Sequence, residues 1–429
     1  MKWFLGPVPK GQKKVILVLG VLLTLVGGLL TLCACLVAPI VTVTDLTGAR
    51  RMVIALLTAV LLLLGAGGLT ARQAFRSLAG TPARALRLPP VWALAGAFGL
   101  VVAAALVISN VRVLNVLLFP PALILAAVLP PLGAIVWFTR GAPDDALTWR
   151  RAVPAFAGGA ILGVVLALAL EILLPFLVMT LVLDLADTAV GAVEGLLEAL
   201  AGRQVASAVT GPGFIYAFVQ LALIAPLAEE LVKPLVTLPL VGRISRRTAF
   251  LVGALAGAGF AALENVIYAT VGLPFWAGIL LIRAMGGAIH PLGAGWVAQG
   301  WRAVLRGEPH GGRTWLARFG LATGIHALWN GGSLLVITLA GAGFFGTLPP
   351  AIDVLGLSAA GTTLAFLILL GLLTLWLGRA QVRAEEDLAG LEPRFVLSDR
   401  GAALWALVCL MALVPAGIAG LKLVLGGGP

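Results

Sequence analysis

Three charged side chains lie within five residues of an otherwise apolar stretch, Leu227–Leu235. They are Glu229, Glu230 and Lys233, in a chain that is 61% hydrophobic and 11% charged. An ionisable group in hydrocarbon costs roughly 2.5–3.5 kcal/mol on insertion scales, so each such group is a candidate functional residue. Two carboxylates suit general acid–base chemistry towards water, and Lys233 can pair with either because it stands at i+4 and i+3.

Further polar residues follow in the next three apolar segments. They are Glu264 and Asn265, then Arg283 and His290, and finally His326 and Asn330. Histidine and asparagine can donate hydrogen bonds to a developing oxyanion. Alternatively, Glu229, His290 and His326 form a ligand set for zinc that leaves one position open for water. The residues therefore allow zinc as a cofactor without requiring it.

Several known active-site patterns are absent from the sequence. There is no His-Glu-x-x-His motif, no Gly-x-Ser-Gly with a partnered histidine, and no Gly-x-Gly-Asp. The first would indicate a soluble-type zinc protease. The second and third are typical of rhomboid and presenilin-like intramembrane proteases. Neither a P-loop nor a dinucleotide-binding fingerprint occurs.

The elements that carry these residues are membrane-spanning helices. Mean hydropathy is +1.09, and apolar runs of eighteen or more residues recur along all 429 residues. This pattern predicts an all-α, polytopic transmembrane helical bundle in the cell membrane. About eleven spans are expected, near residues 15–38, 52–69, 91–109, 114–138, 153–182, 214–240, 248–271, 275–299, 317–341, 355–378 and 401–424.

The basic residues fall in short segments between alternate spans. If the N-terminus is cytoplasmic, nearly all of them lie on the cytoplasmic side, as the positive-inside rule requires; the exception is Arg50 with Arg51. This placement explains the net charge of +11 and excludes a nucleic-acid partner. The expected surroundings are the lipid bilayer and a membrane protein or peptide substrate.

Charge content divides the chain into three parts. Residues 1–212 hold five nearly uncharged spans and an outer amphipathic segment, residues 213–342 a polar catalytic core, and residues 343–429 two more spans. Glu171 is interpreted as a helix-end residue that reaches the headgroups. His310 is interpreted as solvated, and the three cysteines as apolar fillers.

The helical rise of 1.5 Å per residue gives each polar residue a depth in the membrane. Glu264 and Arg283 both come out roughly 24 Å from the cytoplasmic edge, which predicts an ion pair. Glu229, Glu230, His290, His326 and Asn330 share a second layer at roughly 15 Å. A single site in which these five residues meet is therefore expected.

Four stretches resemble the PrsW-type intramembrane protease family, part of the wider group that includes type II CAAX prenyl endopeptidases. The matching residues are Glu229-Glu230-x-x-Lys233, Phe260-x-x-x-Glu264-Asn265, His290 and His326-x-x-x-Asn330. CAAX-type members typically place histidine four residues after the phenylalanine. Glu264 with Asn265 is therefore similar to the PrsW branch.

The resemblance implies an endopeptidase that cleaves membrane-associated proteins, with anti-sigma factors as the best-known kind of substrate. It implies that a glutamate, with Glu229 favoured, activates water and that His326 and Asn330 bind the oxyanion. Both a glutamate mechanism and a metal mechanism stay open. Two other classes also stay open: a transporter or ion channel that uses the buried charges, and a catalytically silent scaffold of the same fold.

Overall fold

The fold is known from a computed structural model of the chain. It describes residues 10–44, 46–111, 114–115, 118–140, 142, 146–175, 194–196, 198–199, 202–341 and 359–384. Within these ranges every regular element is a helix, and the one β-type pairing is an isolated bridge between Ala85 and Thr148. The predicted all-α membrane class is therefore confirmed.

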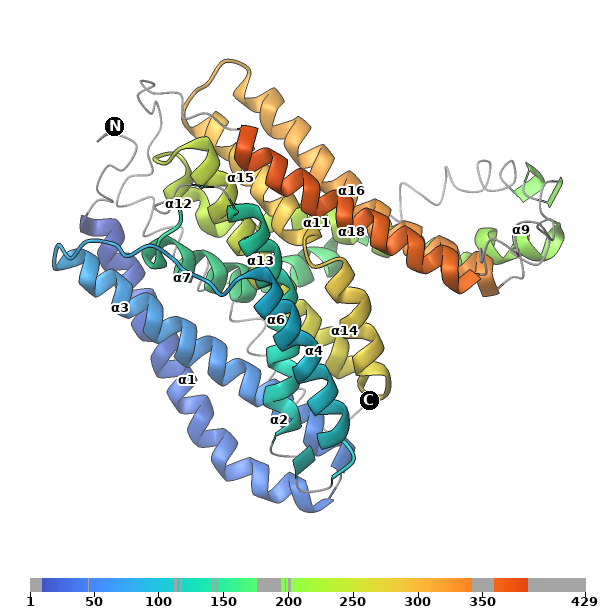
Figure 1. Ribbon diagram of the computed structural model, residues 1–429, viewed down its shortest axis with the longest axis horizontal. Coiled ribbons are helices and arrows are strands. Elements are labelled where there is room, and N and C mark those ends of the chain that lie inside the picture. The colour runs from blue at the N-terminus through green and yellow to red at the C-terminus, as the bar shows by residue number, and fades with distance from the viewer. Residues whose placement is uncertain are drawn as a thin grey trace.

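The helices follow one another along the chain as shown in Figure 1. They are α1 (Lys10–Thr44), α2 (Leu46–Val60), the π-helix η1 (Leu61–Ala66), α3 (Gly67–Leu78), α4 (Val91–Ile108), α6 (Phe119–Thr139), α7 (Trp149–Gly158), the π-helix η2 (Gly159–Gly163), α9 (Arg203–Thr210), α10 (Pro212–Phe218), the π-helix η3 (Val219–Ile224), α11 (Ala225–Val232), the 3-10 helix η4 (Leu235–Thr237), α12 (Leu238–Val241), α13 (Arg246–Val271), the 3-10 helix η5 (Leu273–Phe275), α14 (Trp276–Met285), α15 (Ile289–Leu305), α16 (Gly311–Gly341) and α18 (Ala359–Ala384).

Eight of the described helices are long and apolar enough to cross a membrane. A ninth span results if α14 and α15, which meet at an angle of 42°, count as one. The predicted span near 401–424 lies outside the described residues, as does part of the predicted outer amphipathic segment. The count of about eleven spans and the cytoplasmic N-terminus remain predictions.

Helix α13 stands at the centre of the bundle, and 83% of its most apolar stretch is buried. Its glycines allow two neighbouring backbones to approach closely. A Cβ on Gly257 would lie 2.2 Å from the carbonyl oxygen of His290 in α15, and one on Gly259 would lie 2.0 Å from that of Phe156 in α7. Small residues at such crossings are the usual means of tight helix packing in membranes.

Two breaks in the helices expose backbone groups close to the polar residues. Helix α11 ends at Val232 with Lys233 as its C-cap, and Pro234 comes next; proline has no N–H and cannot continue the hydrogen-bonding ladder. The second break, at Gly286–Ala288, separates α14 from α15, so the predicted single span at 275–299 is two helices. Such breaks are tolerated at membrane depth only where protein surrounds them.

An ion-pair cluster ties the ends of α13 and α15 to the segment before α16. Glu308 accepts hydrogen bonds from Arg246 at the start of α13 and from Arg302 in α15. Burial raises the pKa of Glu308, but the two guanidinium groups outweigh it and hold the pKa below its usual value. The ionised cluster therefore fixes this end of the bundle.

We expect Glu308→Gln to lower the apparent unfolding temperature, because it leaves Arg302 almost buried without its carboxylate; breaking such a pair costs on the order of 3 kcal/mol. A group with a lowered folded-state pKa stabilises the fold above its unfolded-state pKa and loses this effect as the pH falls. The difference from wild type should therefore be full at neutral pH and shrink in acid, as measured by thermal unfolding in detergent. The exposed Glu194→Gln is the control, and a constant difference across pH would contradict the assignment.

Candidate active site

All nine residues that the sequence singled out lie in one connected polar network. Its members come from α11 and its C-cap, α13, α14, α15 and α16. They are Glu229, Glu230, Lys233, Glu264, Asn265, Arg283, His290, His326 and Asn330. The two layers expected from helical rise are joined, because His290 contacts members of both.

Lys233 is the centre of this network. Its Nζ lies 2.8 Å from Glu229 Oε2, 2.7 Å from Glu230 Oε1 and 2.6 Å from His290 Nδ1, and the side chain is fully buried. The Phe260 ring covers the ammonium with its centroid 4.4 Å away, a cation–π contact. The ammonium donates hydrogen bonds to Glu230 Oε1 and His290 Nδ1, whereas its contact with Glu229 Oε2 is an ion pair without hydrogen-bond geometry.

The arrangement of donors and acceptors assigns the tautomer of His290. The Lys233 ammonium can only donate, so His290 Nδ1 must carry a lone pair. The proton then sits on Nε2, which lies 3.0 Å from Glu264 Oε2 and donates to it. Arg283 Nη2 lies 3.2 Å from the same nitrogen, and with this tautomer it makes no hydrogen bond there, because a guanidinium can only donate. Glu264 therefore orients this imidazole from the side opposite Lys233.

Glu264 is itself held by the predicted ion pair with Arg283. The guanidinium of Arg283 donates to Glu264 and, through Nε, to Asn265 Oδ1 at 2.6 Å. Asn265 Nδ2 donates to the carbonyl of Ala127 in α6 at 3.0 Å. This chain of hydrogen bonds fixes Glu264, and with it His290, against a neighbouring helix.

His326 is oriented in the same way from α16. Its Nδ1 lies 3.0 Å from Glu230 Oε1, so this nitrogen donates to the carboxylate and Nε2 keeps the lone pair. Asn330, one turn further along α16, lies with Nδ2 3.3 Å from His326 Nε2. The same Nδ2 donates to the carbonyl of Leu221 in the π-helix η3 at 2.9 Å. The predicted pairing of His326 with Asn330 is thus present.

The two glutamates of the pair differ in what surrounds their second oxygen. Glu229 Oε2 is ion-paired with Lys233 Nζ at 2.8 Å but accepts no hydrogen bond of normal geometry, and it lies 3.6 Å from His290 Nδ1 and 3.9 Å from His326 Nε2. Glu230 Oε2 is also without a hydrogen bond, but it is packed against Gly293, where a Cβ would lie 2.3 Å away. Glu229 is therefore the glutamate of the pair whose oxygen faces both imidazoles without accepting a hydrogen bond.

The residues predicted as zinc ligands fit a metal by their chemistry. One ligand atom each from Glu229, His290 and His326 lies within 4.8 Å of the others, and all three residues are buried. A carboxylate and two imidazoles are a known ligand set of catalytic zinc. The Lys233 ammonium, however, lies 2.8 Å from Glu229 Oε2 and 2.6 Å from His290 Nδ1, so a cation bound through these two atoms would compete with it for the same lone pairs.

Some contributors to the network were missed by the sequence interpretation. Glu171, assigned to the headgroups, interacts electrostatically with Glu229, Glu264 and Lys233. The carbonyls of Leu221 and Ala127 accept hydrogen bonds from the site, and backbone acceptors leave no trace in a pattern of side chains. For Glu171 the signal was available, since it is the one notable acid in the first five predicted spans.

Fold and site together define a polytopic helical membrane protein with a buried glutamate–histidine–lysine network. Residues 148–355 match the family described as PrsW family intramembrane metalloprotease, and this confirms the resemblance seen in the sequence. The match supports an intramembrane protease in general, and it contains every residue of the network. No curated protein and no solved structure matched the chain.

We expect Lys233→Met to bind zinc more tightly than the wild-type chain does. Removal of the ammonium frees lone pairs on Glu229 Oε2 and His290 Nδ1 and leaves uncompensated negative charge that favours a cation. The measurement is zinc content after dialysis against graded free zinc, read by mass spectrometry of the metal. Lys233→Met combined with His290→Ala is the control and should lose the gain. Equal zinc content in wild type and Lys233→Met would contradict the competition.

Proposed function

We propose that the chain is an intramembrane endopeptidase that hydrolyses peptide bonds of membrane-associated proteins. The observation that carries the proposal is Glu229 Oε2, a buried carboxylate oxygen that is ion-paired with Lys233, accepts no hydrogen bond of normal geometry and faces two oriented imidazoles. Desolvated carboxylates held in this way are the usual means of activating water in such sites. The family match to residues 148–355 supports the same reaction class.

In the proposed mechanism Glu229 takes a proton from a water molecule whose oxygen attacks the carbonyl carbon of the substrate. The carbonyl π-electrons move to oxygen, Glu229 passes the proton from water on to His326 Nε2, and this N–H together with Asn330 Nδ2 donates hydrogen bonds to the oxyanion. When the C–N bond breaks, the same proton returns from His326 through Glu229 to the leaving amine. The products are a carboxylic acid and an amine, so one water is consumed in each cleavage.

The other residues position these groups. Glu230 holds His326 by its Nδ1, and Glu264 holds His290 by its Nε2. Lys233 keeps the two carboxylates side by side, which like-charge repulsion would otherwise prevent. Asn330 is only half-buried, unlike its neighbours, so the substrate carbonyl is expected to approach from its side.

Glu229, His290 and His326 are the residues that would hold a metal ion. When bound, zinc supplies Lewis-acid polarisation of the carbonyl and a more acidic water. In the proposal Glu229 acts as the base without such an ion, because the Lys233 ammonium already supplies the cation of the site. Cleavage should therefore persist in the presence of a chelator.

We expect Glu229→Gln to reduce cleavage by roughly 10²- to 10⁴-fold, the usual contribution of a general base. The amide keeps the shape of the side chain but cannot take a proton. The measurement is cleavage of a panel of single-pass transmembrane segments, each fused to a reporter, in proteoliposomes that contain wild type or variant. The exposed Glu194→Gln is the matched control, with thermal unfolding as the test of folding.

Each alternative has its own signature in this assay. Equal cleavage by wild type and Glu229→Gln would overturn the assignment of the base. Loss of cleavage on chelation, with recovery on addition of zinc, would replace the glutamate mechanism by the metal mechanism. Ion or solute flux through the proteoliposomes without any cleavage would favour the transporter class.

A further inference from the structure

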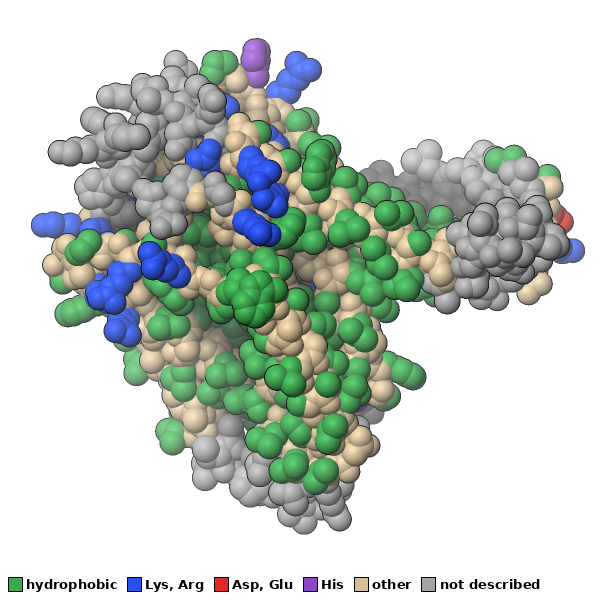
Figure 2. Space-filling model, in the orientation of Figure 1, with side chains coloured by type: hydrophobic (Ala, Val, Ile, Leu, Met, Phe, Trp, Pro, Cys, Tyr) green, Lys and Arg blue, Asp and Glu red, His purple; other side chains and the backbone are tan. Residues whose placement is uncertain are grey.

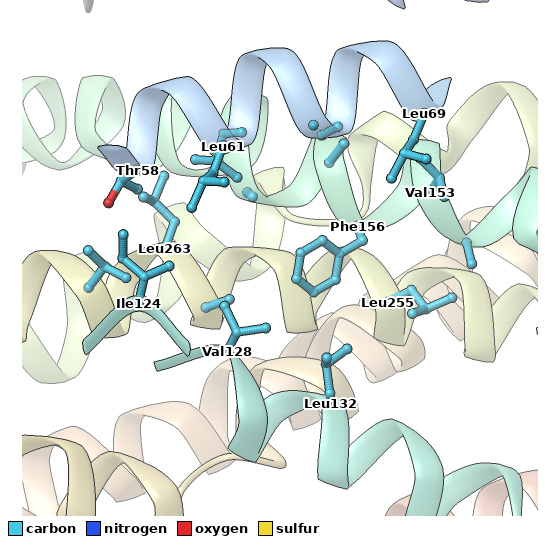
Figure 3. Close-up of a pocket in the computed structure, with 18 of the residues that line it drawn as sticks. Thr58, Leu61, Leu69, Ile124, Val128, Leu132, Val153, Phe156, Leu255 and Leu263 are labelled. Atoms are coloured by element: carbon cyan, nitrogen blue, oxygen red, sulfur yellow. The ribbon is translucent and has the colours of Figure 1, made fainter. Parts of the chain in front are cut away.

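A second feature of the fold lies on the opposite side of α13 from α15. An apolar cavity of about 420 Å³, partly open at the surface, is lined by the helix formed by α2, η1 and α3, together with α6, α7 and α13. Figure 3 shows Phe156 pointing into it, with Thr58 and Ile124 near one end and Leu69 and Val153 near the other. The hydroxyl of Thr58 donates a hydrogen bond to the carbonyl of Ile54 within its own helix. The cavity wall therefore presents almost only apolar groups to an occupant.

The cavity is elongated. Thr58 and Leu69, which lie near its two ends, are separated by roughly 16 Å of helical rise. Water is a poor occupant, because an apolar cavity provides none of the polar partners that buried water needs. A single hydrocarbon chain fits both the shape and the chemistry.

One end of the cavity is basic. Leu69, Leu86 and Trp149 line the cavity close to Arg76, Arg84 and Arg150 in the sequence. The backbone joins these segments, since Trp149 N donates to the Arg84 carbonyl at 3.1 Å and the Arg150 guanidinium donates to the Thr81 carbonyl. Figure 2 shows lysine and arginine side chains gathered over this end of the molecule, where α3 ends.

The arginines at this end lack anionic partners within the described part of the chain. Neither Arg76, Arg84 nor Arg150 forms an ion pair with a described carboxylate, and Arg150 Nε is buried without a hydrogen bond. Arg76 and Arg150 are close enough to repel each other. An anion placed between them would relieve this repulsion and supply the missing acceptor.

We propose that this cavity binds one anionic glycerophospholipid, with an acyl chain in the apolar cavity and the phosphate at Arg76, Arg84 and Arg150. The bound lipid would contact α13 through Leu255, Leu263 and Val266, on the helix that carries Glu264 and Asn265 of the active site. The inference stands apart from the proposed peptidase activity, because it concerns binding alone.

A larger side chain at Gly65 should fill the cavity without displacing its neighbours. It lines the cavity, and a Cβ built on it has nothing within 4 Å, so Gly65→Leu adds bulk without a clash. Gly99 in α4 is a matched control, since it is equally open and does not line the cavity. For the basic end, Arg76→Gln with Arg150→Gln tests the phosphate contact, and the exposed Arg313→Gln is the control.

The experiment is native mass spectrometry of the full chain in detergent, titrated with phosphatidylglycerol or with phosphatidylcholine of the same acyl chains. Wild type, Gly99→Leu and Arg313→Gln should retain one phosphatidylglycerol in preference to phosphatidylcholine. Gly65→Leu should bind either lipid roughly tenfold more weakly or worse. The Arg76→Gln, Arg150→Gln double variant should lose about tenfold in affinity for phosphatidylglycerol alone, as expected for a lost charge-assisted hydrogen bond.

Two results would overturn the proposal. The first is retention by Gly65→Leu equal to that of Gly99→Leu, which would place any bound lipid outside the cavity. The second is equal affinity of wild type for the two lipids, which would remove the role of the arginines. Inorganic phosphate at millimolar concentration serves as a further arm: displacement of the lipid by phosphate alone would show that the acyl chain contributes nothing.

Discussion

The site depends on a single buried cation. Lys233 Nζ lies within 2.8 Å of two carboxylates and one imidazole in a side chain with no exposed surface. Two adjacent glutamates could not both stay ionised in an apolar bundle without such a counter-charge, because desolvation and mutual repulsion both act against them. The ammonium also determines which nitrogen of His290 carries a proton. The proposed chemistry therefore begins with the placement of Lys233.

The placement of Lys233 in turn depends on where the helix breaks. Lys233 is the C-cap of α11, and Pro234 prevents the helix from continuing. On the opposite wall, the break at Gly286–Ala288 lets α14 and α15 meet at 42°, so that Arg283 and His290 both reach Glu264. In each case a break in the helix lies beside ionisable residues of the site.

Much of the site could be predicted from the sequence, because the depth of a residue in the membrane follows from its position along a spanning helix and the rise per residue. Helical rise alone paired Glu264 with Arg283 and placed Glu229, Glu230, His290, His326 and Asn330 together. Rise gives no information about sideways packing, so the contact of His290 with Glu264 across the two layers was not predicted. The cavity beside α13 was also invisible, since its lining residues resemble any other lipid-facing leucine or alanine. The membrane class and most spans followed from hydropathy, whereas the bend between α14 and α15 did not, because glycine is common within straight spans too.

The glycines of α13 also determine how the molecule can move. At Gly257 the backbone of α13 touches the backbone of α15 beside His290, so these two helices cannot separate or slide without losing contacts that no side-chain rotation replaces. Helix α16 is also packed closely on η3, since a Cβ on Gly331 would lie 2.7 Å from Ala222 Cβ, and Asn330 donates a hydrogen bond to the Leu221 carbonyl. The contact of α13 with α15 at Gly257 is thus made between two backbones, whereas the contact of α16 with η3 is made through side chains. An opening that admits a peptide should therefore move α16 against η3 more readily than α13 against α15, so that the oxyanion donors move while the histidine fixed by Glu264 stays in place.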